Sequence, residues 1–335
     1  MLINAHTHLE LSGLAHMVPT VATRFGKWLS KVGRKLHRRN AVWFRESCEL
    51  GIQQLLAAGT THVGDISWSG ESVEPLVRSG LEGIVWLEMR GSALSAAEAR
   101  FKWLQQEVDR LRQAVANSAI ELGIEMHAPY SVHPLLWEPI LHWIDQQRLP
   151  LCIHAAESPG EWELFRHATG ELCHFEGRMA MSAWPLWLRR VAARLVNRNR
   201  TSAAIHDRVI PRDEDTTPVS YLEQMGALKR KPLLVHMVQV TDDDIERVRR
   251  CGSTVVHCPR SNQLLGCGRM PLEKMIAAGI PVLLGTDSLA SSPTLDVRDE
   301  VKAAKTMHRG SVGEDCLEAL ARDKTGFQSL GFKWP

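Results

Sequence analysis

The alternation of short apolar runs with longer helical patterns constrains the fold of this 335-residue chain more than any other feature. Most of the short runs are continuously apolar, as expected for parallel strands that are buried on both faces. The expected strands are Leu2–His6, Thr60–Ile66, Gly83–Met89, Glu121–His127, Leu151–His154, Leu233–His236, Thr254–His257 and Val282–Gly285. The expected helices are Trp43–Ala58, Ala96–Ala116, Leu136–Gln147, Asp242–Cys251 and Pro271–Ala278. The glycines placed to cap helix C-termini are Gly59, Gly80, Gly252 and Gly279.

Strands that alternate with helices predict the α/β class, and a (β/α)8 TIM-like barrel fits this order better than an open doubly wound sheet. We expect one barrel to span residues 1–335. Residues 158–232 are too long for a single βα unit and are expected to form an insertion between strands five and six. Within it, the Trp- and Arg-rich stretch Ser182–Arg200 is expected to be a lid or a dimer contact, so a homodimer is kept open.

The charge balance and the lack of long apolar runs exclude several classes of protein. The net charge is +2 with neutral histidines and no nucleic-acid-binding module is recognisable, so we expect no nucleic-acid partner. No run approaches the ~18 apolar residues that span a bilayer, and no signal peptide is recognisable, so we expect no membrane contact. The seven cysteines are scattered without a Cys-x-x-Cys pair, which predicts reduced thiols in a cytoplasmic protein.

Polar side chains gather at the carboxyl ends of the expected strands. In a barrel these ends surround one mouth, where barrel enzymes carry their sites. An open sheet would spread the same residues along an edge, so their placement is a second argument for the barrel. The residues are His6, His8, His127, His154, His236 and Asp287.

His6 and His8 lie two residues apart on the first expected strand, so they point to the same face. This spacing also arises by chance in a chain with 15 histidines. With His154 and Asp287 they offer three imidazoles and one carboxylate, which suits one divalent metal ion: zinc first, with iron or manganese as alternatives. Asp287 could instead cap a helix. An ion with an open position lowers the pKa of a bound water to about 7.

Two further residues fit acid–base chemistry on a heterocyclic substrate. Glu157, three residues after His154, is placed to protonate a ring nitrogen, although alone it also fits a solvated loop carboxylate. His236 could orient or deprotonate the water, and Asp287 could double as proton acceptor. Together these residues predict attack of water on an electron-poor ring carbon of a small molecule, and displacement of ammonia from an aminopurine fits well.

Six motifs distribute these residues along the chain. They are Asn4-Ala5-His6-Thr7-His8, His127-Ala128-Pro129-Tyr130-Ser131, His154-Ala155-Ala156-Glu157, Leu234-Val235-His236, Val256-His257-Cys258-Pro259-Arg260-Ser261-Asn262 and Leu284-Gly285-Thr286-Asp287-Ser288. Their order resembles the amidohydrolase superfamily, in its branch of adenosine and S-adenosylhomocysteine deaminases and chlorohydrolases. The first motif with its continuation to Ser12, and the Cys258–Asn262 run, look most like the aminodeoxyfutalosine deaminase subgroup, which serves the futalosine route to menaquinone.

The resemblance implies a mononuclear metal site, a proton donor and a residue beside the hydrolytic water. The implied metal ligands are His6, His8, His154 and Asp287. Glu157 is the implied proton donor to the heterocycle, and His236 lies beside the water. The candidate substrate contacts are His127, Glu10, Arg90 and Ser288. The expected substrate is 6-amino-6-deoxyfutalosine; S-adenosylhomocysteine or guanine deamination, or chloride displacement from an s-triazine, are alternatives.

The resemblance also implies a small β-sandwich built from segments that flank the barrel. Only three residues precede Asn4, and the chain ends soon after strand eight and its helix, so we expect this sandwich to be largely missing. This leaves a second interpretation, in which a truncated and inactive barrel acts as a binding protein.

One basic stretch and one histidine stand outside this scheme. Arg24–Arg39 holds seven basic residues and no acidic one, with apolar residues at helical spacing. We expect a solvated helix face; the alternative is attraction of an anionic substrate, for which Arg24, Arg90 and Arg260 are candidates. His257 is expected to be structural, because its strand continues into a Cys-Pro turn.

Overall fold

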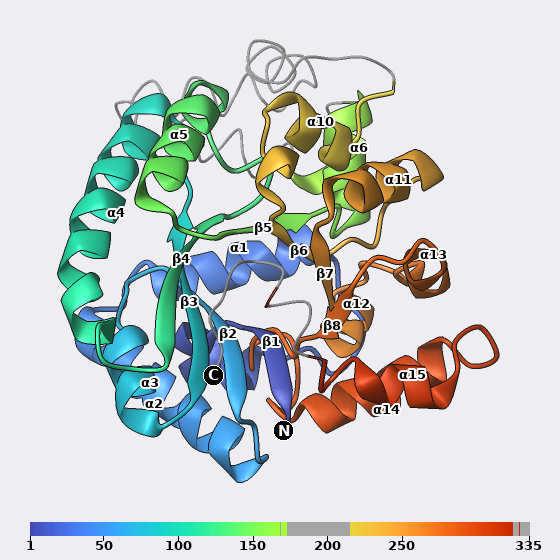
Figure 1. Ribbon diagram of the computed structural model, residues 1–335, viewed down its shortest axis with the longest axis horizontal. Coiled ribbons are helices and arrows are strands. Elements are labelled where there is room, and N and C mark those ends of the chain that lie inside the picture. Colours follow the sequence, from blue (N-terminus) through green and yellow to red (C-terminus); the bar gives the residue numbers. More distant parts are fainter. Residues whose placement is uncertain (168, 173–214, 324–327, 329–335) are drawn as a thin grey trace.

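The computed structural model describes residues 1–167, 169–172, 215–323 and 328 and shows a (β/α)8 barrel. Eight parallel strands form one sheet in the order of the sequence. In Figure 1 the strands lie in the centre, and the helices surround them. The strands are β1 (Ile3–Thr7), β2 (His62–Ser67), β3 (Glu82–Met89), β4 (Ile120–Met126), β5 (Leu151–Ala155), β6 (Leu233–His236), β7 (Thr254–His257) and β8 (Val282–Leu284).

Most of the helices pack against the outer faces of the strands. The α-helices are α1 (Phe25–Leu36), α2 (Ala41–Ala57), α3 (Val73–Ser79), α4 (Leu94–Val115), α5 (Trp137–Gln147), α6 (Pro159–His167), α10 (Pro218–Gln224), α11 (Asp242–Cys251), α12 (Pro259–Leu264), α13 (Leu272–Ala277), α14 (Val297–Met307) and α15 (Glu314–Ala319). The 3-10 helices are η1 (Leu9–Met17), η2 (Pro134–Leu136) and η4 (Leu228–Arg230).

Side-chain alternation along the strands divides the hydrophobic residues into two clusters. The smaller cluster contains only residues on or next to strands, and we call it the interior cluster because it fills the barrel. The larger cluster joins the outer strand faces to the helices. Trp86 on β3 is the largest side chain of the interior cluster and is fully buried. Gly123 on β4 lies against it, and a Cβ at position 123 would approach the Trp86 ring to 2.4 Å.

The barrel closes between β1 and β8 through a seam that is not a regular ladder. At the mouth, the Asp287 amide donates to the His6 carbonyl at 3.0 Å. At the opposite end, the chain after α15 fills the gap: the Ile3 amide donates to the Ala321 carbonyl at 2.9 Å, and the Leu284 amide donates to the Leu320 carbonyl at 3.3 Å.

The expected strands are confirmed to within two residues, and so are the bounds of the expected helices. Each glycine placed as a helix cap has a positive φ, between 72° and 78°. The short helices α3, α10, α12, α13 and α15 span seven residues or fewer, and of these the sequence indicated only α13, because two turns rarely show a clear period. The stretch Ser182–Arg200 and most of the expected insertion lie outside the described residues.

Two expectations about composition can be compared with the structure. The six described cysteines are all free, in line with the expectation of reduced thiols. Within the described residues, no helix is both long and apolar enough to span a membrane.

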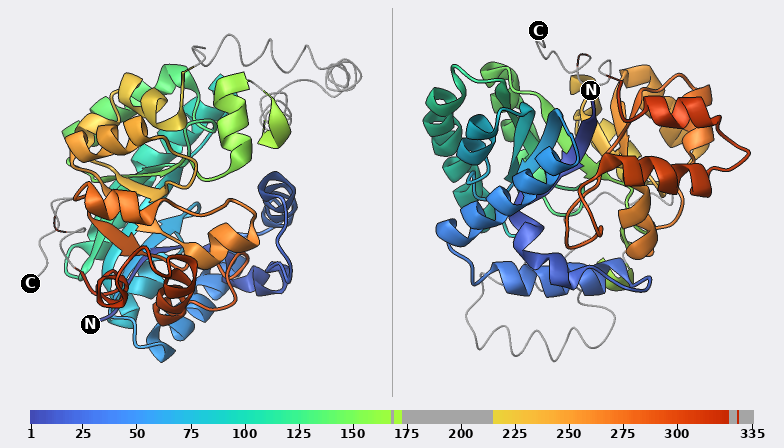
Figure 2. Two further views of the ribbon diagram at one scale, coloured as in Figure 1. Left: turned by 90° about the vertical axis from the view of Figure 1, so that its right-hand side faces the viewer. Right: turned by 90° about the horizontal axis from the view of Figure 1, so that it is seen from below.

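Helix α1 is the basic stretch recognised in the sequence, and it covers the mouth of the barrel. In both views of Figure 2 it lies on the side of the barrel away from the N-terminus. Its apolar face, with Trp28 and Val32, is buried, and the Trp28 indole donates to the Ala290 carbonyl at 2.9 Å. The charged residues of α1 are exposed, and Arg34, with Arg38 and Arg39 just after the helix, lines the cavity at this mouth.

Candidate active site

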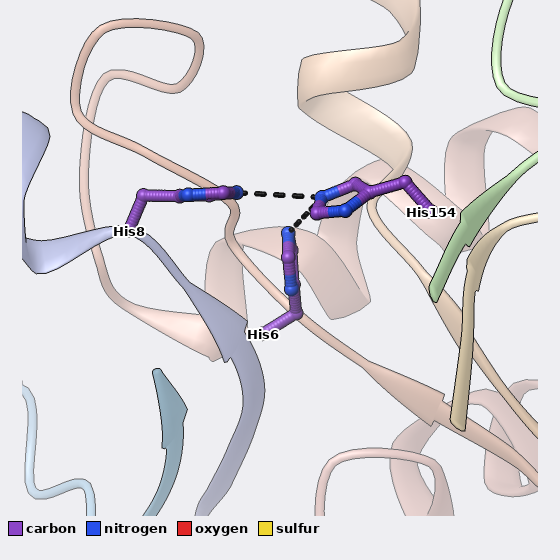
Figure 3. A group of neighbouring side chains, drawn as sticks. All are labelled: His6, His8 and His154. Carbon is purple, nitrogen blue, oxygen red and sulfur yellow. Dashed lines mark hydrogen bonds between the residues drawn. The ribbon is translucent and has the colours of Figure 1, made fainter. Parts of the chain in front are cut away.

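Three histidine rings converge at the mouth of the barrel (Figure 3). The Nε2 atom of His154, on β5, lies 3.2 Å from Nε2 of His6 and 3.4 Å from Nε2 of His8. The pairing of β1 with β2 is irregular here, since Thr7 pairs with Asp65 while Asn4 pairs with Val63. This bulge adds one residue to β1, and it turns the His6 ring into the barrel directly after the interior residue Ala5.

Asp287 faces the same three rings from beyond β8. Its Oδ1 atom lies 3.8 Å from Nε2 of His6 and 3.6 Å from Nε2 of His8. Its Oδ2 atom accepts a hydrogen bond from the Ser261 hydroxyl at 2.6 Å, which leaves Oδ1 directed at the rings. Asp287 has a φ of 59°, a left-handed conformation that points its side chain back across the mouth.

The donor set fits a divalent metal ion. Tetrahedral coordination with Zn–N bonds of about 2.0–2.1 Å places neighbouring nitrogens about 3.3–3.4 Å apart. The two Nε2–Nε2 separations at His154 match this spacing before any adjustment. Burial lowers the pKa of His6 and of His8 well below the usual value, so both imidazoles are neutral and have a lone pair available. The structure therefore brings together all four ligands expected from the sequence.

Buried carboxylates and amides fix the orientation of these side chains. Asp65 on β2 accepts hydrogen bonds from the Thr7 hydroxyl and the Leu9 amide, both at 2.9 Å, and so holds the turn that carries His8. Asn262 accepts from Nδ1 of His236 at 2.9 Å through its Oδ1 atom. Since an amide oxygen only accepts, the Nδ1 atom of His236 carries the hydrogen and Nε2 presents its lone pair to the mouth.

Glu157 and His236 lie against each other beside the histidines. Oε1 of Glu157 lies 3.4 Å from Nε2 of His236. Burial raises the pKa of Glu157 well above that of a free glutamate, which favours a protonated carboxyl at neutral pH. Burial lowers the pKa of His236 to about 3, which keeps its imidazole neutral. His236 has a φ of 76°, and this left-handed conformation turns its ring toward the mouth at the end of β6.

A cavity of about 1260 Å³ opens above these residues. Its floor includes His8, His154 and Asp287, and its walls include Trp28 of α1 and Arg90 after β3. This volume is ample for a nucleoside with a substituent, since ligand cavities commonly measure about 300–1,000 Å³.

Three of the four expected substrate contacts line the cavity, and one of these three is already engaged in hydrogen bonds. His127 lines the cavity, and its Nδ1 atom lies 2.7 Å from the Ser131 hydroxyl. Arg90 also lines it, with its guanidinium 5.3 Å from the Trp68 ring. Glu10 reaches the cavity wall, but its carboxylate already accepts hydrogen bonds from Ser67, Trp68 and Ser69.

Three other expected residues lie away from the cavity wall. Ser288 is buried and hydrogen-bonded to the Ser291 hydroxyl at 2.9 Å. Arg260 is bound to Glu300 at 2.6 Å, and Arg24 has an exposed side chain near Glu171. Of the three arginines considered singly for an anionic substrate, Arg90 lines the cavity, and Arg34, Arg38 and Arg39 of the basic stretch line it as well.

Several residues of the site carried no recognisable signal in the sequence. Ser261 and Asn262 lie within a quoted motif, yet their contacts with Asp287 and His236 depend on the meeting of α12 with two strand ends. Glu161 accepts the Glu157 amide at 2.8 Å from one turn into α6. Glu125 lies against Nδ1 of His154 from the neighbouring strand. Glu125 lies two residues before His127, so strand alternation places both on the same face; this was the one sequence signal that Glu125 faces the site.

A parallel barrel whose mouth gathers a three-histidine group and a buried glutamate–histidine pair belongs to the class of (β/α)8 barrel enzymes. Residues 2–321 match the Amidohydrolase family. The chain therefore belongs to the amidohydrolase family and is a hydrolase of carbon–nitrogen bonds, which confirms the family and the enzyme class expected from its motifs.

Individual relatives extend the comparison. The chain is 36% identical over 310 residues to aminodeoxyfutalosine deaminase of Deinococcus radiodurans, covering 92% of this chain and 68% of the relative. It is 26% identical to 5-methylthioadenosine/S-adenosylhomocysteine deaminase of Carboxydothermus hydrogenoformans, covering 95% and 63%. A crystal structure of Helicobacter pylori aminofutalosine deaminase in complex with methylthio-coformycin superposes with a TM-score of 0.79 at 22% identity, over 98% of this chain and 73% of that one.

Proposed function

We propose that this protein is a mononuclear metal-dependent aminohydrolase that replaces the 6-amino group of an adenine-like nucleoside by oxygen and releases ammonia. The observation that carries the proposal is the convergence of His6, His8, His154 and Asp287 beside the Glu157–His236 pair. The similarity to a relative named aminodeoxyfutalosine deaminase supports 6-amino-6-deoxyfutalosine as the substrate. Zinc is the proposed metal, since neutral imidazoles and one carboxylate suit it, with iron or manganese as alternatives.

The roles of the chain's own residues follow from their environment. A bound divalent ion would lower the pKa of water and so make a hydroxide nucleophile available near neutral pH. Glu157, kept protonated by burial, donates its proton to a ring nitrogen and makes the adjacent carbon more electrophilic. His236 accepts a hydrogen bond from the attacking water at Nε2. As the carbon–oxygen bond forms and the carbon–nitrogen bond breaks, protons delivered to the amino group let it leave as ammonia.

The cavity supports a substrate larger than adenosine. His127 projects from the end of β4 and is placed to contact the ribose. Arg90 and the aromatic side chains Trp28 and Trp68 line the wall farther from the base. This combination of an arginine with aromatic faces suits a distal half that carries both a ring and an anionic group.

S-adenosylhomocysteine is the second candidate substrate, because a deaminase named for it matches 95% of the chain. One substrate panel separates the candidates. We expect the zinc-loaded protein to release ammonia, with loss of adenine absorbance, fastest from 6-amino-6-deoxyfutalosine. Faster release from S-adenosylhomocysteine, or chloride release from an s-triazine, would move the assignment to that substrate.

The matched control for this panel is the zinc-loaded His308→Gln variant, which alters a buried histidine away from the mouth and should retain activity. If the zinc-loaded protein releases no ammonia from any aminopurine, the deaminase proposal is wrong. The interpretation of the chain as an inactive binding protein would then take its place.

A further inference from the structure

Glu125 is a carboxylate inside the barrel that the proposed reaction does not use. Its neighbours Ile124 and Met126 belong to the outer cluster, so its side chain points to the interior. It is 0% exposed and pairs in register with Cys152, two residues before His154 on β5. Its Oε1 atom contacts Nδ1 of His154. Neither carboxylate oxygen has another hydrogen-bond partner among the described residues.

Burial of the Glu125 carboxylate is unfavourable for the stability of the fold, which points to a role other than stabilisation. A buried carboxylate loses its hydration, and one partner returns only part of that free energy. The neighbouring carboxylate across the β3–β4 ladder, Glu88, lies 3.5 Å from Arg90, so the Arg90 guanidinium has its own counter-ion.

The two nitrogens of His154 face opposite surroundings. Nε2 points to the other two histidines of the candidate metal site, at 3.2 Å and 3.4 Å, while Nδ1 faces Glu125. A neutral imidazole has one nitrogen that donates and one that accepts. A carboxylate at Nδ1 holds the hydrogen there, so Nε2 is the nitrogen left to offer a lone pair to a metal ion.

We propose that Glu125 is a positioning residue for the metal site: it fixes the ring and the tautomer of His154 and thereby strengthens binding of a divalent ion by His6, His8 and His154. Partners of this kind commonly change metal affinity by about 10–100-fold. The inference rests on the metal site of the proposed function, but it does not depend on which substrate that site accepts.

Zinc affinity of the whole protein provides the test. The apoprotein of the wild type, Glu125→Gln and Glu125→Met is titrated with zinc in competition with a chromophoric chelator. We expect Kd for zinc to rise by about 10–100-fold in Glu125→Met. A smaller rise is expected in Glu125→Gln, since its amide oxygen still accepts from Nδ1. The visible spectrum of the cobalt-loaded protein should shift in the same order, because the donor strength of His154 changes.

Thermal unfolding of the apoproteins separates this role from a purely structural one. An imidazole can lose its charge when its partner is removed, whereas a guanidinium cannot. Removal of the Glu125 carboxylate should therefore leave the Tm of the apoprotein unchanged or raise it, so stability and zinc affinity are expected to change in opposite directions. The control is Glu300→Gln, which removes a buried carboxylate bound to Arg260 and should lower Tm without changing Kd.

Two results would overturn the inference, and they differ in what else they overturn. If wild type binds zinc and both Glu125 variants bind it equally well, Glu125 has no positioning role and the metal site stands. If wild type itself binds neither zinc nor cobalt, the metal site of the proposed function is lost together with the role of Glu125.

Discussion

Two groups of buried histidines lie on opposite faces of the same sheet. At the mouth, Nε2 of His154 lies 3.2 Å from Nε2 of His6. On the outer face, Nε2 of His257 on β7 lies at the same 3.2 Å from Nε2 of His308, at the C-terminal end of α14. The separation of the imidazoles is therefore not what makes a site.

The two groups differ in what surrounds the pair. The mouth adds a third imidazole and a carboxylate oxygen from Asp287, and it opens to a cavity. The outer pair is closed by packing between β7 and α14, with Glu273 3.6 Å from Nδ1 of His308. Within the described part of the chain, only the mouth group has three convergent ligand atoms. Convergence of further ligands, rather than burial or proximity of histidines, separates a metal site from a structural pair.

The largest expected effect comes from removing one histidine of the mouth group. His154→Ala should lose bound zinc and lower kcat/KM by about 10⁴-fold or more, because the nucleophile is no longer available at neutral pH. His308→Gln should retain zinc and most of its activity. Metal content and ammonia release measure both. Equal losses in the two variants would mean that the comparison of the two groups is wrong.

A smaller loss is expected when the acid–base pair is altered and the ligands are kept. Glu157→Gln removes the proton donor, and kcat should fall by about 10²–10⁴-fold while zinc content stays that of the wild type. Steady-state kinetics on the best substrate, together with metal analysis, check this. Glu163→Gln, which changes an exposed glutamate of α6, serves as the control. A Glu157→Gln enzyme with wild-type kcat would assign the proton donation to another group.

Metal removal should lower the thermal stability of the protein only when the histidines at the mouth are intact, whether or not the outer pair is altered. A ligand present at 1,000 times its Kd stabilises the folded state by about 4 kcal/mol. Zinc should therefore raise Tm of the wild type and of His257→Gln, whereas His6→Ala should show little shift. Differential scanning calorimetry with and without a chelator measures this difference. A zinc-dependent rise that persists in His6→Ala would place the bound ion elsewhere.

The smallest effect is a pH dependence of the outer pair. Burial and the neighbouring His308 lower the pKa of His257 to about 3, below the ordinary value of a histidine in the unfolded chain. Between about pH 6.5 and 3, His257 thus binds a proton in the unfolded state but not in the folded state. The free energy of unfolding should fall by about 1.4 kcal/mol per pH unit from this group as the pH drops.

Urea unfolding at pH 6.5 and pH 5.5 tests that dependence. His257→Gln should lack this part of the decrease, and the exposed His16→Gln should keep it. The same decrease in the wild type and in His257→Gln would show that the buried pair does not supply it.

The strands and the residues that gather at the mouth could be predicted because both leave local signals. Continuous apolar runs mark strands that are buried on both faces, and the polar residue that ends each run marks the mouth. The expectation that His257 is structural agrees with its place on the outer face, opposite the interior residue Val256.

The remaining features depend on relationships that no local pattern contains. Glu125 looks like any glutamate in a strand until the register of β4 against β5 brings it to His154. The hydrogen bonds that occupy Glu10 come from a loop more than fifty residues away, in the segment Ser67–Ser69. The left-handed backbone at His236 and Asp287 reverses the direction that alternation would assign to these side chains.

The seam between β1 and β8 bears on the order in which the site is completed during synthesis. His6 and His8 are synthesised long before Asp287 and Ala321, whose backbone groups hold β1 on its β8 side through hydrogen bonds. A nascent chain offers neither partner until most of the barrel has left the ribosome. His6 and His8 are thus synthesised well before the contacts that hold β1 can form, and a metal ion captured before that moment would meet an unfinished ligand set.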